Sequence, residues 1–189
     1  DGADDKSGSH NLVLGMEHSY ASFGGVVSGR NNTLTGETAV ALGGSDNLVS
    51  GRRAVAIAGQ QNEASGSKAF AGAGLENIAS GNYAAVVGSY SGEASGYTAA
   101  ISGGRKNLAS GDYSAVSGGQ LNTASGEKSW SGGYQNEASG ENAVTSGGSN
   151  NAAFDTYSTV AGGDSQTSSG ANSVVVSGYA TTAYADDTG

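Results

Sequence analysis

Small apolar and small polar residues alternate along most of this chain in a pattern that returns every fifteen residues. Residues 107–121 carry one full copy, and nearly the same fifteen residues begin again at Asn122. With the Asn as position one, the repeats start at Glu17, Asn32, Asn47, Asn62, Asn77, Gly92, Asn107, Asn122, Asn136, Asn151, Gln166 and Thr181, and one step has fourteen residues. A short fixed period is typical of a solenoid, in which each repeat buries its apolar residues against its neighbours.

Each repeat contains two segments with the composition of short strands. They are positions two to four, as in residues 63–65, and positions eight to eleven, as in residues 54–57, where small or β-branched residues dominate. Glycine at position five and a Gly-Gly pair at positions twelve and thirteen predict two corners per coil. Asn at position one tolerates the left-handed backbone region, and its amide can bond the Asn of the next coil.

These features predict an all-β fold, a parallel β-solenoid of about 11–12 coils. With strands stacked about 4.8 Å apart, the rod would be roughly 55 Å long. We expect residues 1–10 to be a weakly ordered lead-in and residues 11–189 to form a single domain. Within it, residues 11–30 would be an amino-terminal cap, residues 31–181 the regular repeats and residues 182–189 a tail.

Positions nine and ten of the longer strand segment point to opposite sides of a strand, and some coils are apolar at both. One side can fill the thin coil, so the other must be covered, and self-association of identical chains would cover it. We therefore expect this strand to form the interface of a homotrimer. The candidate interface residues are Val55, Ile57, Val86, Val87, Ile101, Val116, Val160, Val174, Val175 and Val176.

Composition removes several classes of function. The chain has 34 glycines, no proline, no cysteine and a net charge of -9, with its charges scattered singly. An acidic surface argues against nucleic acid and anionic membranes as partners, and disulfides are impossible. We find neither an apolar run long enough to span a membrane nor a signal peptide, so no direct membrane contact is expected of this chain.

The repeats resemble a known family. The Asn-x-Ala-Ser-Gly corner followed by Ser-Ala-Val-Ser-Gly-Gly is similar to the head repeats of YadA-like trimeric autotransporter adhesins, and residues 39–43 and 157–163 resemble two variants of that repeat. The resemblance covers roughly residues 17–181. It implies a left-handed β-roll, three chains about one axis, an extracellular position on the bacterial surface, and adhesion to a host or cell-surface protein or glycan. The neck, stalk and membrane anchor of that family are missing from the chain.

No catalytic, cofactor-binding or metal-binding motif is found, and we expect the protein not to be an enzyme and to need no cofactor. Residues 126–129 lack the spacing of a phosphate-binding loop, and a serine triad would need a histidine. His10 and His18 are the only histidines. They are either metal ligands or, as we prefer, ordinary residues of the cap.

Three departures from the repeat are candidates for ligand binding. Trp130, the only tryptophan, lies in the shortened coil, where it either fills the volume of the missing residue or binds a partner. Phe154 stands where other coils have Ser or Thr, as an exposed anchor or a cover for its corner. Tyr83, Tyr97 and Tyr113, beside Asp112, fall at neighbouring corners and either form an outward stack or are separate surface residues.

The leading functional hypothesis is thus a non-enzymatic adhesin head. The alternatives are a structural spacer, a receptor-binding segment of a phage tail fibre and, ranked lower, an ice-binding solenoid. The serine rank at position four would serve the last, but it is one residue wide and flanked by variable charges. It comprises Ser50, Ser65, Ser80, Ser95, Ser110 and Ser125.

Overall fold

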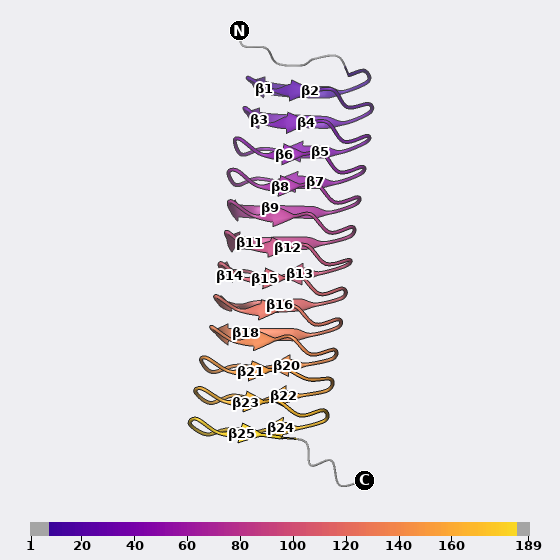
Figure 1. The fold of residues 1–189 in the computed structure, drawn as a ribbon. Coiled ribbons are helices and arrows are strands. Elements are labelled where there is room, and N and C mark those ends of the chain that lie inside the picture. The colour runs from indigo at the N-terminus through magenta and orange to yellow at the C-terminus, as the bar shows by residue number, and fades with distance from the viewer. Residues whose placement is uncertain (1–7, 185–189) are drawn as a thin grey trace.

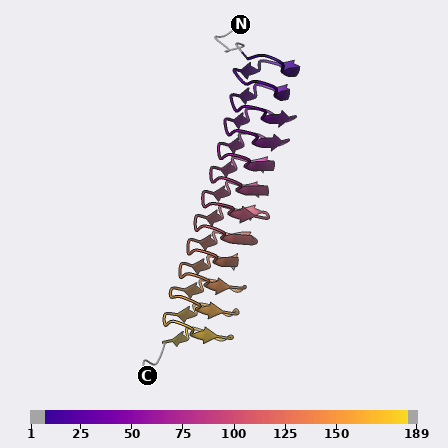
Figure 2. The same ribbon diagram turned by 90° about the vertical axis from the view of Figure 1, so that its right-hand side faces the viewer.

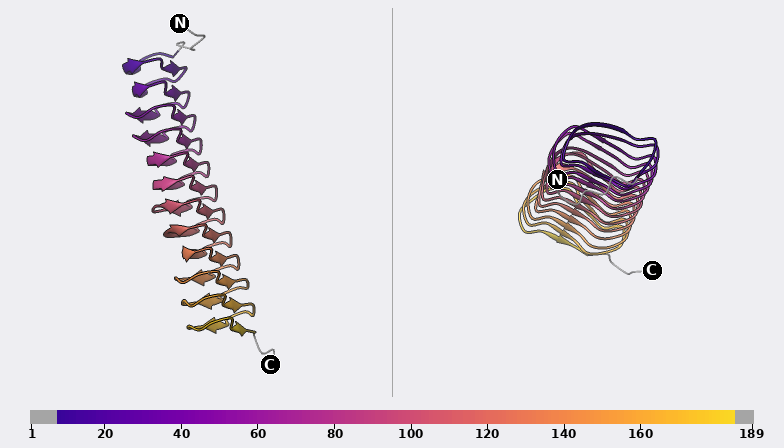
Figure 3. Two further views of the ribbon diagram at one scale, coloured as in Figure 1. Left: turned by 90° about the vertical axis from the view of Figure 1, so that its left-hand side faces the viewer. Right: turned by 90° about the horizontal axis from the view of Figure 1, so that it is seen from above.

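The computed structural model describes residues 8–184, which form a straight stack of coils (Figures 1 and 2). Seen from above, the coils lie over one another with a steady sideways offset (Figure 3). The prediction of an all-β parallel solenoid with a repeat of about 15 residues and about 11 turns is confirmed. Most of the expected lead-in and the end of the expected tail lie outside the described residues.

Most coils contribute one strand to each of two parallel sheets, one coil contributes both β13 and β14 to the larger sheet, and neighbouring coils pair in register. The 13-stranded sheet contains β1 (Leu12–Met16), β3 (Val26–Arg30), β5 (Val40–Leu42), β7 (Val55–Ile57), β9 (Phe70–Leu75), β11 (Ala85–Tyr90), β13 (Ala100–Ile101), β14 (Gly104–Arg105), β16 (Ala115–Gln120), β18 (Trp130–Tyr134), β20 (Val144–Thr145), β22 (Thr159–Val160) and β24 (Val174–Val175). The 12-stranded sheet contains β2 (Ser19–Tyr20), β4 (Thr33–Leu34), β6 (Leu48–Val49), β8 (Glu63–Ala64), β10 (Ile78–Ala79), β12 (Glu93–Ala94), β15 (Leu108–Ala109), β17 (Thr123–Ala124), β19 (Glu137–Ala138), β21 (Ala152–Ala153), β23 (Thr167–Ser168) and β25 (Thr182–Ala183).

The core lies between the two sheets and is only one side chain thick on each side. Position three of the 12-stranded sheet and position ten of the 13-stranded sheet point inward and are buried. In several coils a large residue on one sheet is matched by a small one on the other, as in Leu34 with Ala41 and Ala94 with Ile101. No coil from 32 to 180 places large residues at both inward positions, as the thin core requires.

Side-chain amides at position one tie the coils together along one corner. The Asn77 Oδ1 accepts the backbone N–H of Gly92 at 3.0 Å, and its Nδ2 donates to the carbonyls of Ala73 at 3.0 Å and Ser89 at 2.7 Å. The same arrangement recurs at the Asn residues of most coils and continues through Gln166 to Thr181. The expected internal ladder therefore exists, although most of its bonds join side chain to backbone rather than amide to amide.

Glycine corners let the backbones of successive coils approach closely. A Cβ on Gly111 at position five would overlap the carbonyl oxygen of Gly126, and one on Gly119 at position thirteen would overlap that of Gly133. Gly119 also has a φ of 88°, which favours glycine. The two glycine positions of the repeat thus set the stacking distance.

The first repeat starts one residue later than the sequence pattern indicated. His18, and not Glu17, takes position one: its Nδ1 accepts the N–H of Asn32 at 3.2 Å, and its Nε2 lies 3.1 Å from the carbonyl of Leu14. Glu17 takes the last position of the preceding coil, with the left-handed φ found there in the other coils. Two coils, 18–31 and 122–135, therefore have fourteen residues.

One coil replaces the ladder amide with a hydroxyl. Gly92 occupies position one and has no side chain, while Ser89 stands at position thirteen, where most coils have glycine. The buried Ser89 Oγ donates to the Gly104 carbonyl at 3.3 Å, the bond that an Asn at position 92 would donate. A Cβ on Gly92 would lie only 2.5 Å from that Oγ, so the two substitutions compensate each other.

Asn151→Ala should lower the free energy of unfolding by roughly 3 kcal/mol, because it leaves the Gln166 N–H and the carbonyls of Gly147 and Gly163 without their side-chain partner. Chemical denaturation measures the change. Gln60→Ala, which alters an exposed side chain, is the control and should be close to neutral. Equal losses in the two variants would contradict the role given to the ladder.

Ser89→Gly with Gly92→Asn should restore the regular ladder, so the double variant should be at least as stable as the natural chain. Gly92→Asn alone should be destabilised by the overlap with Ser89, and Ser89→Gly alone by the loss of its bond. The coupling between the two sites should therefore exceed about 1 kcal/mol in a double-mutant cycle. Additive effects would show that the two positions are independent.

Ser114→Ala and Ser129→Ala should each raise stability by about 1 kcal/mol, because the buried Oγ atoms of these two residues have no hydrogen-bond partner. Ser158 occupies the same position in another coil, but its Oγ accepts the Asp155 N–H at 3.2 Å. Ser158→Ala should therefore lower stability. Thermal unfolding of the three variants compares them directly, and a loss in all three would refute the assignment.

Candidate functional site

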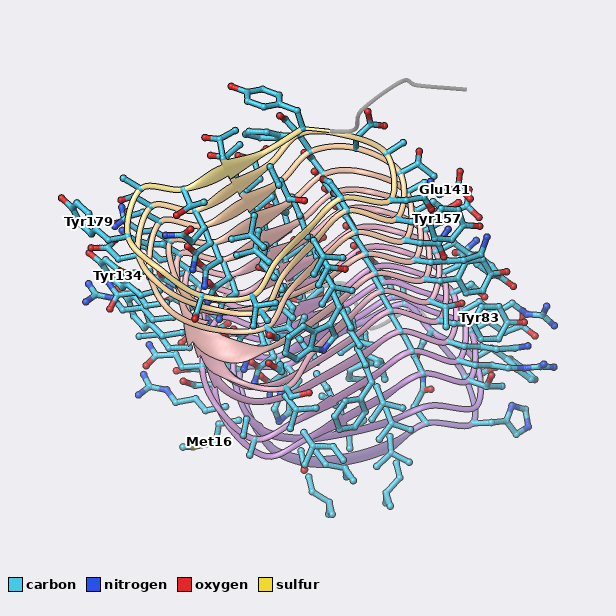
Figure 4. All side chains as sticks on the ribbon, turned by 90° about the horizontal axis from the view of Figure 1, so that it is seen from below. Met16, Tyr83, Tyr134, Glu141, Tyr157 and Tyr179 are labelled. Atoms are coloured by element: carbon cyan, nitrogen blue, oxygen red, sulfur yellow. The ribbon has the colours of Figure 1, made fainter. Side chains whose placement is uncertain are left out.

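The outer surface of the rod consists of two corners and two faces. In the described chain, every Lys and Arg lies at a corner, at positions six, seven, fourteen or fifteen, and most carboxylates do the same. Viewed from below, Tyr83, Glu141 and Tyr157 project from one corner, and Met16, Tyr134 and Tyr179 project from the opposite one (Figure 4). The two faces lie between these rows of large polar side chains.

The 13-stranded sheet presents what we call the uncharged face, formed by positions nine and eleven of each coil from Val26 to Val176. Neither position holds a charged residue in any of these coils. Position nine is Val26, Val40, Val55, Phe70, Ala85, Ala100, Ala115, Trp130, Val144, Thr159 and Val174. Position eleven is Ser28, Leu42, Ile57, Gly72, Val87, Ser102, Ser117, Gly132, Ser146, Ala161 and Val176.

The geometry of the uncharged face is that of a two-dimensional lattice. Equivalent residues of neighbouring coils pair in register, as Val40 does with Val55 and Ala85 with Ala100. Parallel strands repeat about every 4.8 Å across the sheet, and alternate residues repeat about every 7 Å along a strand. Apart from two coils with an aromatic residue and a glycine, the face therefore offers two ranks of methyl and hydroxyl groups on a rigid, hydrogen-bonded backbone.

The 12-stranded sheet presents the serine face, formed by positions two and four. Ser50, Ser65, Ser80, Ser95, Ser110, Ser125 and Ser139 form its regular rank at position four. Position two beside it varies between aliphatic residues, serine, threonine and three glutamates, Glu63, Glu93 and Glu137. The serine face is thus regular in one rank only, and charges interrupt the other.

The candidate tyrosines form a stack at the corner between the faces. The rings of Tyr83 and Tyr97, and those of Tyr97 and Tyr113, meet edge to face with centroids 5.5 Å apart. Asp112 supports the stack, since its Oδ1 accepts the Tyr97 N–H at 2.9 Å. Lys68 Nζ bonds the Tyr83 hydroxyl at 2.8 Å, and this bond lowers the pKa of that hydroxyl.

The other two candidates lie on different faces. Phe154 is exposed at position four of the serine face, in line with the serine rank. Trp130 is half-buried at position nine of the uncharged face, and its indole extends over Gly132 instead of filling the shortened corner. The structure therefore brings the three tyrosines and Asp112 together but leaves Trp130 and Phe154 apart from them.

The ten candidate interface residues divide between the inside and the outside of the coil. Val86, Ile101, Val116, Val160 and Val175 are buried in the core of a single chain. The other five point outward and belong to the uncharged face: Val55, Ile57, Val87, Val174 and Val176. The sequence pattern could not separate the two groups because both faces of the strand are apolar in coils such as 77–91.

Among residues 8–184, no group of three or more His, Asp and Glu side chains could hold a metal ion, and no pocket forms. His10 packs beside Phe23 with ring centroids 5.1 Å apart, whereas His18 belongs to the ladder. The described part of the chain also has no helix long and apolar enough to cross a membrane. The rod therefore offers surfaces, and no enclosed site, for function.

Comparison with known proteins identifies the family to which this rod is similar. Residues 34–133, more than half of the chain, match the sequence profile of the family described as Grass antifreeze beta roll. A search of curated proteins found no match. Because the matched family is one of non-enzymatic antifreeze proteins, the prediction that the chain is not an enzyme is confirmed.

The same match corrects the adhesin hypothesis. The resemblance to YadA-like heads was wrong, as were the host or cell-surface ligand and the placement on a bacterial surface or phage fibre. The expected homotrimer stays a prediction. The resemblance rested mainly on ladder, glycine and core positions, which any solenoid with this repeat needs in order to stack, and its outward residues were small ones such as Ser110 and Ser117. The ladder, glycine and core positions carry no information about the outward surface. The lower-ranked alternative, an ice-binding solenoid, agrees with the match.

Proposed function

The chain belongs to the grass antifreeze β-roll family, and we propose that it binds ice through the uncharged face. The observation that carries this proposal is the absence of charge from both ranks of that face, from Val26 to Val176, on a protein that carries charges on all its other sides. The serine rank at position four, which the sequence alone suggested as an ice-binding surface, is only one residue wide.

Charge matters because an ion holds its hydration water strongly. A Lys or Glu side chain would keep a disordered shell of water between the protein and the crystal, and removing that shell costs far more than removing water from a methyl or hydroxyl group. Three glutamates interrupt the serine face, at residues 63, 93 and 137. The uncharged face has no such barrier in any coil from Val26 to Val176.

Regular spacing and rigidity favour the same face. A crystal repeats in two directions, and so do the two ranks of this face, because the coils pair in register across the sheet. Backbone hydrogen bonds and the buried ladder hold the strands in place before any ligand is met. Little conformational entropy is therefore lost when the face contacts a surface.

The large area of the uncharged face compensates for the weakness of each contact with ice. Single methyl and hydroxyl contacts are individually small, but they add when they are held on one rigid plane. An ice-binding face must also remain accessible, so we propose that one chain acts by itself with this face uncovered. Association through positions nine and eleven would remove the surface that contacts ice.

Ser117→Lys should abolish most of the thermal hysteresis of the protein, because it places an ammonium group with its hydration shell in the centre of the uncharged face. Ser110→Lys is the matched control: it makes the same substitution in the same coil, but on the serine face. It should leave thermal hysteresis close to that of the natural chain. Circular dichroism checks that both variants keep the fold.

Three outcomes would contradict the proposal. Activity that survives Ser117→Lys but is lost in Ser110→Lys would assign ice binding to the serine face. Equal activity in both variants would place the ice-binding surface elsewhere. No thermal hysteresis or inhibition of ice recrystallisation in the natural chain would reject ice binding itself.

A further inference from the structure

Two coils of the uncharged face carry an aromatic residue at position nine, and both of them have glycine at position eleven. The pairs are Phe70 with Gly72 and Trp130 with Gly132. Glycine occurs at position eleven in no other coil from Ser28 to Val176. An aromatic ring on this face is therefore always accompanied by an absent side chain two residues further along the same strand.

The rings occupy the space that these glycines leave. Position eleven is exposed in the coils that carry a side chain there, from Leu42 to Val176, but Gly72 and Gly132 are both buried. A Cβ on Gly72 would overlap the Phe70 ring, at 2.6 Å from Cζ. A Cβ on Gly132 would lie 2.5 Å from Ser117 Oγ of the neighbouring coil and in van der Waals contact with the indole, 3.4 Å from Trp130 Cη2. Each ring thus extends along its strand and covers the glycine.

Neither glycine is needed by the backbone. Gly72 and Gly132 are not among the residues with positive φ, unlike the corner glycines Gly74 and Gly133 that follow them. Other coils place Ile57, Val87 or Ser117 at the same position without difficulty. The reason for glycine therefore lies in the neighbouring side chains rather than in the conformation of the strand: the phenyl ring at Gly72, and the indole together with the Ser117 hydroxyl at Gly132.

We propose that Phe70 and Trp130 lie in the plane of the ice-contacting surface, and that Gly72 and Gly132 determine its flatness by letting the rings lie down. This inference rests on the proposed function. An upright indole or phenyl ring at position nine would project above Val55, Ala85 or Ala115 and would hold several coils away from ice. A ring that lies over glycine presents its face at the level of the neighbouring side chains.

Gly132→Val tests the inference on the single tryptophan of the chain. A valine Cβ alone would only contact the indole, but its two Cγ methyl groups extend beyond that position and should displace the ring from the strand. Trp130 emission should then shift to longer wavelength, and acrylamide should quench it more strongly. Thermal hysteresis should fall by more than half in the same variant. Ser102→Val is the matched control, since it adds a valine at position eleven beside Ala100, and it should change neither measurement.

A second substitution should restore activity. Trp130→Ala combined with Gly132→Val reproduces the natural pair of Ala85 and Val87, which has no ring to displace. We expect this double variant to recover most of the thermal hysteresis lost in Gly132→Val. Phe70→Val with Gly72→Ile, which reproduces Val55 and Ile57, should likewise recover the activity lost in Gly72→Ile.

The outcomes of these experiments distinguish a failure of this inference from a failure of the proposed ice-binding function. If the natural chain has thermal hysteresis and Gly132→Val keeps it in full, or if the double variant recovers nothing, the flatness role is refuted while ice binding stands. An unchanged Trp130 emission in Gly132→Val would refute the ring geometry itself. No activity in the natural chain would overturn the proposed function, and this inference with it.

Discussion

The coils keep their positions because one side-chain amide binds the backbone of neighbouring coils at the same time. Asn77, for example, accepts a hydrogen bond from Gly92 and donates to Ala73 and Ser89, so it fixes both the corner of its own coil and the approach of the next. A buried backbone group that lost such a partner would cost about 1–3 kcal/mol. The lattice of the uncharged face therefore depends on a polar column on the inside of the rod.

The architecture could be predicted from the sequence because the stacking positions are repeated so strictly. Asn at position one and glycine at positions five and thirteen have few physical explanations other than tightly stacked corners, and they fix the period, the two sheets and the parallel pairing. The hydroxyl of Ser89 and the imidazole of His18 show that the ladder tolerates substitutes. Neither substitute could be recognised until the contacts were known.

The candidate site was less predictable because its signal is an absence. No motif marks positions nine and eleven, which stand out only because no coil of the uncharged face has a charged residue there. Where two apolar residues are adjacent, as with Val86 and Val87, the sequence does not tell which of them points out of the coil. The pairing of Trp130 with Gly132 was equally hidden. A glycine among 34 glycines attracts no notice until the indole that covers it is seen.

The two fourteen-residue coils show where this rod accepts changes in chain length. In coil 122–135 the missing residue falls between the strand pairing of Val116 with Ser131 and that of Gly119 with Gly133. In coil 18–31 the register shifts by one residue between the pairing of Val27 with Ala41 and that of Arg30 with Ser45. Both deletions lie at the same corner, and the strands on either side keep their phase. A residue can therefore be lost at this corner while the strands that form the uncharged face keep their pairing, so the length of a coil and the lattice of its face are set by different parts of the repeat.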